Sequence, residues 1–129
     1  MPILKPTIVI VADSGSSAKL FYADNDEFRH IGDVFVDITF EQSGAHADLH
    51  SKPWEEANRL KFYHQLNEEL QTRLQNKEAE ELVVCVPHEG KNELEEHLTT
   101  DVETRIVKIV PKNLHKLSTT ELREYLENA

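Results

Sequence analysis

The spacing of apolar and polar residues predicts where this chain forms strands. Residues 7–12 and 82–86 are continuous apolar runs, which is typical of central strands that are covered on both faces. Residues 33–41 alternate between apolar and polar positions, as does a half-exposed strand near the edge of a sheet. Residues 18–24 alternate more loosely. The connections on either side of residues 18–24 are too short for a crossover, so the first three strands are expected to form an antiparallel meander.

The pattern changes to helical spacing in the middle of the chain. An amphipathic helix is expected over residues 53–76, because a set of apolar residues there falls on one helical stripe: Leu60, Tyr63, Leu66, Leu70 and Leu74. We also expect a helix over residues 89–98 and a strand over residues 102–110. Ser118 and Glu121 have the spacing of a capping box, which predicts the start of a closing helix.

The order of these elements predicts the fold. Strands that are separated by a helix run parallel through right-handed crossovers, and the two wholly apolar strands belong in the middle. The simplest arrangement is an α/β fold with a mixed five-stranded sheet of order 3-2-1-4-5 and helices on both faces, which is the ribonuclease-H-like architecture. Residues 1–129 contain no repeat, low-complexity tract or linker, so a single domain is expected.

Composition and charge narrow the class of partner. The formal net charge of −10 opposes long-range attraction to a phosphate backbone, so no DNA partner is expected. The apolar runs are too short to cross a bilayer and no secretory signal is visible, so we expect no membrane partner. The single cysteine, Cys85, lies in an apolar run, where burial should raise its pKa and make it inert. A cytoplasmic location suits this cysteine usage.

The segment VADSGSSAKLF, residues 11–21, joins the first two strands and is the first candidate site. It looks like the first phosphate loop of the acetate-kinase, sugar-kinase and actin superfamily. That resemblance implies that Asp13 holds a metal-bound water and that Ser14, Ser16 and Lys19 touch phosphoryl oxygens. Those kinases need two such domains, however, and a Gly-Ser turn between strands is more often a simple turn. Both a phosphate site and a strand–turn–strand stay open.

Two other regions carry candidate ligands. His46, Asp48 and His50 alternate in the loop before the long helix, but a third strong metal ligand is not implied, so no metal and no cofactor are expected. The remaining histidines, His115 among them, are scattered singly and are expected at the surface. A basic set stands in the acid-free stretch of residues 104–120, as a basic edge or as solvated lysines: Lys108, Lys112 and Lys116.

Five segments together carry a family resemblance: VADSGSSAKLF, RLKFYHQLNEEL, LVVCVP, NELEEHL and VPKNLHKLSTTELREYL. In these segments the chain resembles the bacterial family labelled "protein required for attachment to host cells". That family is grouped with the bacterial relatives of the archaeo-eukaryotic peptide-chain release factors. The resemblance implies the fold of the release-factor central domain and a role in translation or ribosome rescue.

In release factors the loop before the long helix carries Gly-Gly-Gln, which assists hydrolysis of peptidyl-tRNA. Here that loop reads SGAHADLHSKP, residues 43–53, and lacks the motif. The resemblance therefore implies a non-enzymatic module that docks on the ribosome or tRNA. The docking residues are expected in this loop and on the basic edge: His46, His50, Lys52, Lys108, Lys112 and Lys116.

Two alternatives stay open beside this docking module. The first is a protein–protein module or homodimer, in which the exposed face of the edge strand or Phe35 packs on a partner. The second is an enzyme that acts on phosphate or a nucleotide through the turn of Asp13, Ser14, Gly15 and Ser16, followed by Lys19.

Overall fold

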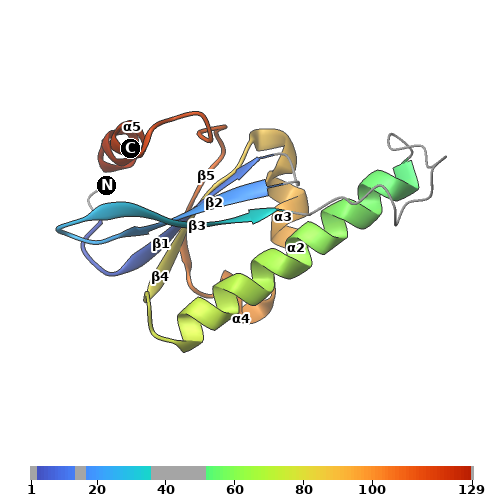
Figure 1. Cartoon of the computed structure of the whole chain (residues 1–129), viewed down its shortest axis with the longest axis horizontal. Coiled ribbons are helices and arrows are strands. Elements are labelled where there is room, and N and C mark those ends of the chain that lie inside the picture. The colour runs from blue at the N-terminus through green and yellow to red at the C-terminus, as the bar shows by residue number, and fades with distance from the viewer. Residues whose placement is uncertain (1–2, 14–16, 36–51, 129) are drawn as a thin grey trace.

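One mixed sheet forms the middle layer of the molecule (Figure 1). The computed structural model describes residues 3–13, 17–35 and 52–128, and the side chains of the last stretch from residue 57 onward. Within these residues the sheet has five strands in the order β3-β2-β1-β4-β5, which confirms the predicted topology. The strands are β1 (Thr7–Asp13), β2 (Ser17–Ala23), β3 (Phe28–Phe35), β4 (Glu81–Cys85) and β5 (Ile106–Val110).

The two wholly apolar runs lie side by side in the centre, as expected. β1 pairs with β4 in parallel, with Ile8 opposite Leu82 and Val11 opposite Cys85. β1 also pairs antiparallel with β2, and β2 antiparallel with β3, which gives the predicted meander. β5 pairs in parallel with β4 at the other edge. β1, β3, β4 and β5 therefore all end at the same edge of the sheet, which we call the carboxyl edge.

Helices cover both faces of the sheet (Figure 1). One face packs against α2 (Lys52–Gln75), α3 (Lys91–His97) and the single turn α4 (Thr100–Glu103), and a 3₁₀ turn, η1 (His88–Gly90), precedes α3. The other face packs against α5 (Thr119–Glu127). Within the described residues, no helix is both long and apolar enough to span a membrane.

Successive residues of the central strands point to opposite faces and fill two cores. Ile8 and Ile10 of β1 are buried on the α2 side. Val9 and Val11 of the same strand are buried on the α5 side. This alternation explains why β1 and β4 contain no polar interruption, because both faces of each strand need apolar residues.

Three predicted elements differ from the structure. β3 begins at Phe28 rather than at residue 33, and its predicted continuation to residue 41 lies outside the described residues. Residues 100–103 form α4, so β5 begins only at Ile106 and not at residue 102. The apolar Val102 that suggested a strand is instead fully buried on the α2 side of the sheet. The predicted helix over residues 89–98 is divided into η1 and α3.

The buried stripe of α2 differs from the prediction at its first residue. Phe62 is fully buried, whereas Leu60 is 53% exposed. At about 100° per residue, Leu60 and Phe62 lie on nearly opposite sides of the helix. The stripe therefore includes Phe62 in place of Leu60, whereas the predicted Tyr63, Leu66 and Leu70 are buried in it and Leu74 packs against it.

Both edge strands contain a bulge. In β3, His30 pairs with Phe21 and Gly32 with Leu20, so Ile31 has no partner in β2. In β5, the register passes over Val107 in the same way. Bulges twist an edge strand and make pairing with a further strand unfavourable.

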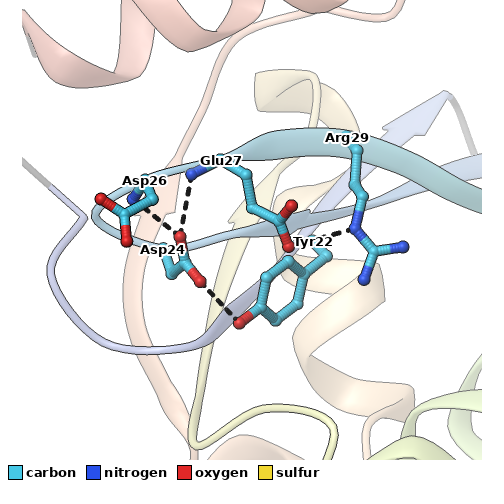
Figure 2. A network of polar contacts seen from close by, with 5 residues as sticks. All are labelled: Tyr22, Asp24, Asp26, Glu27 and Arg29. Carbon is cyan, nitrogen blue, oxygen red and sulfur yellow. Dashed lines mark hydrogen bonds and ion pairs between the residues drawn. The ribbon is translucent and has the colours of Figure 1, made fainter.

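The hairpin turn between β2 and β3 is closed by side chains at the end opposite the carboxyl edge (Figure 2). The Asp24 carboxylate accepts hydrogen bonds from the backbone N–H groups of Asp26 and Glu27, at 2.8 and 2.9 Å. These donors, with the Tyr22 hydroxyl at 2.9 Å, hold the pKa of Asp24 below its usual value. The Arg29 guanidinium lies 5.1 Å from the centre of the Tyr22 ring. The network fixes the turn and thereby the register of β2 and β3.

Candidate functional site

Two of the predicted site residues, Asp13 and Lys19, lie at the carboxyl edge on the α5 side of the sheet. Asp13 is the last residue of β1, and Lys19 in β2 pairs with Val11. Residues 111–118, which we call the β5–α5 loop, follow the carboxyl end of β5 at the same edge. Ligands of open α/β sheets bind outside the carboxyl ends of the strands, so this edge is where a site is expected.

His115 joins the β5–α5 loop to the first hairpin. The Lys19 ammonium donates a hydrogen bond to the His115 carbonyl oxygen at 3.0 Å. The His115 Nε2 atom lies 3.9 Å from Asp13 Oδ2, and both side chains are about one-third exposed. His115 Nδ1 is in hydrogen-bond contact with Asn113 Oδ1. We call Asp13, Lys19, Asn113 and His115 the His115 cluster.

Local sequence holds the β5–α5 loop in one conformation. Asn113 Oδ1 accepts from the His115 backbone N–H, which is the short-range bond that makes asparagine favourable in turns. Leu114 is buried in the core below α5. The predicted capping box is confirmed: Ser118 Oγ accepts from Glu121 N–H at 3.1 Å, and the Glu121 carboxylate accepts from Ser118 N–H at 3.0 Å. The loop is therefore fixed by its own core residue and by the helix that follows it.

The predicted basic edge is divided between two places. Lys112 and Lys116 are exposed on the β5–α5 loop at the carboxyl edge. Within the described part of the chain, neither ammonium has an ion-pair partner. Lys108 is instead half-buried in the middle of β5, opposite Val83. Lys112 and Lys116 are therefore the lysines of this set that the structure brings to the site.

Several other predicted residues cannot be placed in the site. Ser14, Ser16, His46 and His50, with Asp48, lie outside the described residues, and Lys52 is described only as the first residue of α2. In residues 3–13, 17–35 and 52–128, no group of three or more histidine, cysteine or acidic side chains is arranged to hold a metal ion.

His115 and Asn113 were missed as site residues. His115 was expected to be an isolated surface histidine, but it contacts residues about a hundred positions earlier in the chain. The spacing Asn-x-His was the available signal, because an asparagine two residues before an N–H donor favours a turn.

Cys85 is fully buried, and burial raises the pKa of its thiol to about 12. The burial and the raised pKa agree with the expectation, and the inertness of the thiol stays a prediction.

A small cleft lies beside the carboxyl end of β4, between α2 and α3. It is lined by Arg59, Pro87, Glu89, Gly90 and Glu93 and has a volume of about 190 Å³. Two of the lining residues, Arg59 and Glu93, form an ion pair at 2.8 Å. Pockets for small molecules usually measure about 300 to 1,000 Å³, so this cleft is small for such a ligand.

The fold is similar to parts of two translation factors of known structure. An archaeal translation termination factor, aRF1, matches with a TM-score of 0.57 and 12% identity, over 95% of this chain and 38% of that chain. Dom34 of S. cerevisiae is described as a translation termination-like factor involved in RNA quality control pathways and interacting with Hbs1. It matches with a TM-score of 0.54 and 10% identity, over 95% of this chain and 32% of that chain. The chain thus spans about a third of either factor.

Comparison of the sequence with protein families agrees with the fold. No curated protein matches. A family model described as "Bacterial archaeo-eukaryotic release factor family 12" matches residues 37–126, which is more than half of the chain. None of these descriptions mentions attachment to host cells, which stays a prediction of the resemblance. The chain therefore belongs to the family described as bacterial archaeo-eukaryotic release factor family 12, and its fold is that of a part of these release-factor-like proteins.

Proposed function

We propose that this protein is a cytoplasmic module that docks on ribosomal RNA or tRNA of the ribosome and acts there without hydrolysing peptidyl-tRNA. The docking surface consists of the His115 cluster together with Lys112 and Lys116. Family membership and the likeness to translation factors support the ribosome as partner. The sequence has no Gly-Gly-Gln anywhere in its 129 residues, which supports a role other than hydrolysis.

The observation that carries this proposal is that the β5–α5 loop presents two exposed lysines in a conformation that other residues hold in place. Lys112 and Lys116 are exposed cations without an ion-pair partner in the described part of the chain, although the whole chain has a net charge of −10. Lys19 and the capping box hold the loop in place before any partner binds. A preformed loop loses little conformational entropy on binding, so both ammonium groups are available for phosphate contacts.

Ribosome pelleting through a sucrose cushion at a series of salt concentrations tests the proposal. We expect binding that falls steeply between about 50 and 200 mM salt, because phosphate contacts release counterions. The double variant Lys112→Gln/Lys116→Gln should weaken binding and reduce the slope of log K against log salt by about 1.5. No association at any salt concentration would refute ribosome docking.

A charge-matched control separates a local contact from a general charge effect. Lys5→Gln/Lys77→Gln removes the same charge at the opposite edge of the sheet, where Lys5 precedes β1 and Lys77 precedes β4. This control should bind like the wild type. Equal weakening by both double variants would show that net charge, and not the β5–α5 loop, determines the association. Release of peptide from peptidyl-tRNA, measured on stalled ribosomes, should not rise when the protein is added.

The two alternatives stay predictions and have less support from the described residues. A phosphate-acting enzyme would need Ser14 and Ser16, which lie outside the described residues, together with Lys19, of which one N–H donates to the His115 carbonyl oxygen. A protein–protein module or homodimer that packs through the exposed face of β3 would rest on Phe35 as its one large exposed apolar residue. Thermal shift with nucleotides and light scattering of the purified protein test these two alternatives.

A further inference from the structure

Among the described residues, α5 and the core beneath it cover only part of the α5 side of the sheet. On this side, the residues of β2 and β3 that reach the core lie near the hairpin turn. Phe21 and Ala23 are buried there, and Phe28 packs against the same core. Figure 1 shows α5 over this part of the sheet. Toward the carboxyl edge, the same face carries Ser17 and Lys19 of β2 and Asp33 and Phe35 of β3. None of these four residues is buried. We call them the open strip.

The register shows that the open strip is continuous with the His115 cluster. Directly paired residues in neighbouring strands share a face, and Phe35 pairs with Ser17, which pairs with Asp13. Strands are spaced by about 4.8 Å, so Phe35 and Asp13 are about 10 Å apart across the sheet. Asp13 in turn lies 3.9 Å from His115, which is adjacent to Lys116 in the chain.

Phe35 is the unusual residue of this strip, because its side chain is 61% exposed. The other large apolar residues exposed in the described part of the chain lie elsewhere, in α2, in β5 and before β1: Leu60, Val107 and Leu4. A stable protein interface buries about 800 Å² on each partner, and one isolated phenylalanine does not supply an apolar centre for it. One aromatic ring is sufficient, however, to stack a single nucleic-acid base.

Charged groups of both signs lie near Phe35. The acid of the strip, Asp33, lies 2.8 Å from His30 Nε2, and Asp13 faces His115. The two carboxylates are thus directed at imidazoles. Lys112 and Lys116 are exposed in the β5–α5 loop at the same carboxyl edge, with Lys116 directly after His115, and neither has a carboxylate partner among the described residues. An exposed aromatic ring and ammonium groups at the same edge of the sheet match a base and its neighbouring phosphates.

We propose that the open strip binds a single-stranded segment of RNA, with one base stacked on Phe35 and phosphates of neighbouring nucleotides on Lys112 and Lys116. This inference rests on the proposed function and specifies it: the part of the ribosome or tRNA that is recognised is an unpaired segment, not a duplex. The separation of about 10 Å between the rows of Phe35 and Asp13 fits a segment of a few nucleotides.

Fluorescence anisotropy with a labelled single-stranded RNA 12-mer of mixed sequence tests the inference. Phe35→Ala should weaken binding by about 5- to 100-fold, the range that stacking of one base gives. Phe35→Trp should retain binding, because indole also stacks. Val107→Ala removes an apolar side chain that is 50% exposed on the opposite edge strand, and it should bind like the wild type. Circular dichroism spectra confirm that each variant is folded.

The outcomes distinguish this inference from the proposed function. If wild type pellets with ribosomes but Phe35→Ala binds the 12-mer as well as wild type does, the inference is wrong and ribosome docking stands. Equal affinity for the same RNA as a duplex would also overturn it, because a paired base is not available for stacking. If Phe35→Ala changes the mass in light scattering and not the RNA affinity, the strip is a protein interface. Failure of wild type in both assays would refute both proposals.

Discussion

Asn67 joins three helices, and its replacement should destabilise the protein more than replacement of any surface amide. Its side chain is 8% exposed, in the middle of α2. Nδ2 donates to the carbonyl oxygens of Tyr63 at 3.0 Å and of His97 at 2.6 Å. Oδ1 accepts from the backbone N–H of Thr99 at 3.0 Å. His97 is the last residue of α3 and Thr99 is the N-cap of α4, so one amide satisfies both helix ends.

The variant Asn67→Leu keeps the size of the side chain but leaves the His97 carbonyl and the Thr99 N–H without this partner. A buried polar group that loses its hydrogen bond costs about 1 to 3 kcal/mol. Both groups are partly accessible to water, which lowers the cost, so a loss of about 2 to 3 kcal/mol is expected. For a domain of this size the melting temperature should fall by roughly 6 to 12 °C.

Asn67→Asp provides a second and more specific test. One carboxylate oxygen can still accept from Thr99, but the other replaces a donor and faces the carbonyl oxygens of Tyr63 and His97. Burial and these carbonyls favour the protonated acid, so the introduced carboxyl should have a higher pKa in the folded than in the unfolded state. A raised pKa of an acid makes the folded state less stable as pH rises. The variant should therefore be more destabilised at pH 8 than at pH 5.

Urea unfolding followed by circular dichroism at both pH values measures these effects. Asn92→Asp is the control, because Asn92 is exposed in α3, and it should change stability by less than about 0.5 kcal/mol. The reasoning fails if Asn67→Leu is as stable as wild type, or if the destabilisation by Asn67→Asp does not depend on pH.

Other features predict stability and thiol reactivity. Lys77 follows α2 with a φ of 60°, so Lys77→Gly should stabilise by about 0.5 to 1 kcal/mol in urea unfolding, and a loss would contradict this. Burial raises the pKa of Cys85 to about 12, so its thiol should react with a disulfide reagent at pH 8 only in the unfolded protein. Ser118→Ala should cost about 1 kcal/mol in the same unfolding assay. Hydrogen bonds from Ser118 lower the pKa of Glu121, so this carboxylate stabilises the fold above its unfolded pKa of about 4.3 and the effect is lost as pH falls further. Glu121→Gln should reduce that pH dependence.

The two central strands could be predicted from the sequence because each of them packs against an apolar core on both faces. β1 and β4 are buried on both faces, so neither contains a polar residue in the paired stretch from Ile8 to Val11 and from Leu82 to Cys85. Such a run has few alternatives to a central strand. The edge strand β3 is different, because Arg29 and His30 are exposed and the bulge at Ile31 interrupts the alternation. The start of β3 therefore left no periodic signal.

The candidate site was predictable only where its residues are close in sequence. Asp13 and Lys19 stand in one hairpin, so their common location followed from the strand–turn–strand pattern. The contact between Lys19 and His115 joins residues 96 positions apart. It depends on where the β5–α5 loop passes over the sheet, which the buried Leu114 and the Ser118 cap determine. The capping box at Ser118 can be predicted from a single sequence, but the path of the β5–α5 loop over the sheet cannot.

The acidic character of the chain opposes long-range attraction to RNA, and for the same reason it can give selectivity. At about 0.1 M salt, charges separated by more than about 10 Å are largely screened. Acidic residues remote from the open strip therefore lower the rate at which RNA approaches more than they weaken the bound complex. Two lysines alone then give little affinity for a duplex that offers only phosphates. RNA that presents an unpaired base to Phe35 gains the additional stacking energy. In this arrangement the net charge of −10 disfavours non-specific nucleic-acid binding, and the exposed phenylalanine favours the unpaired segment.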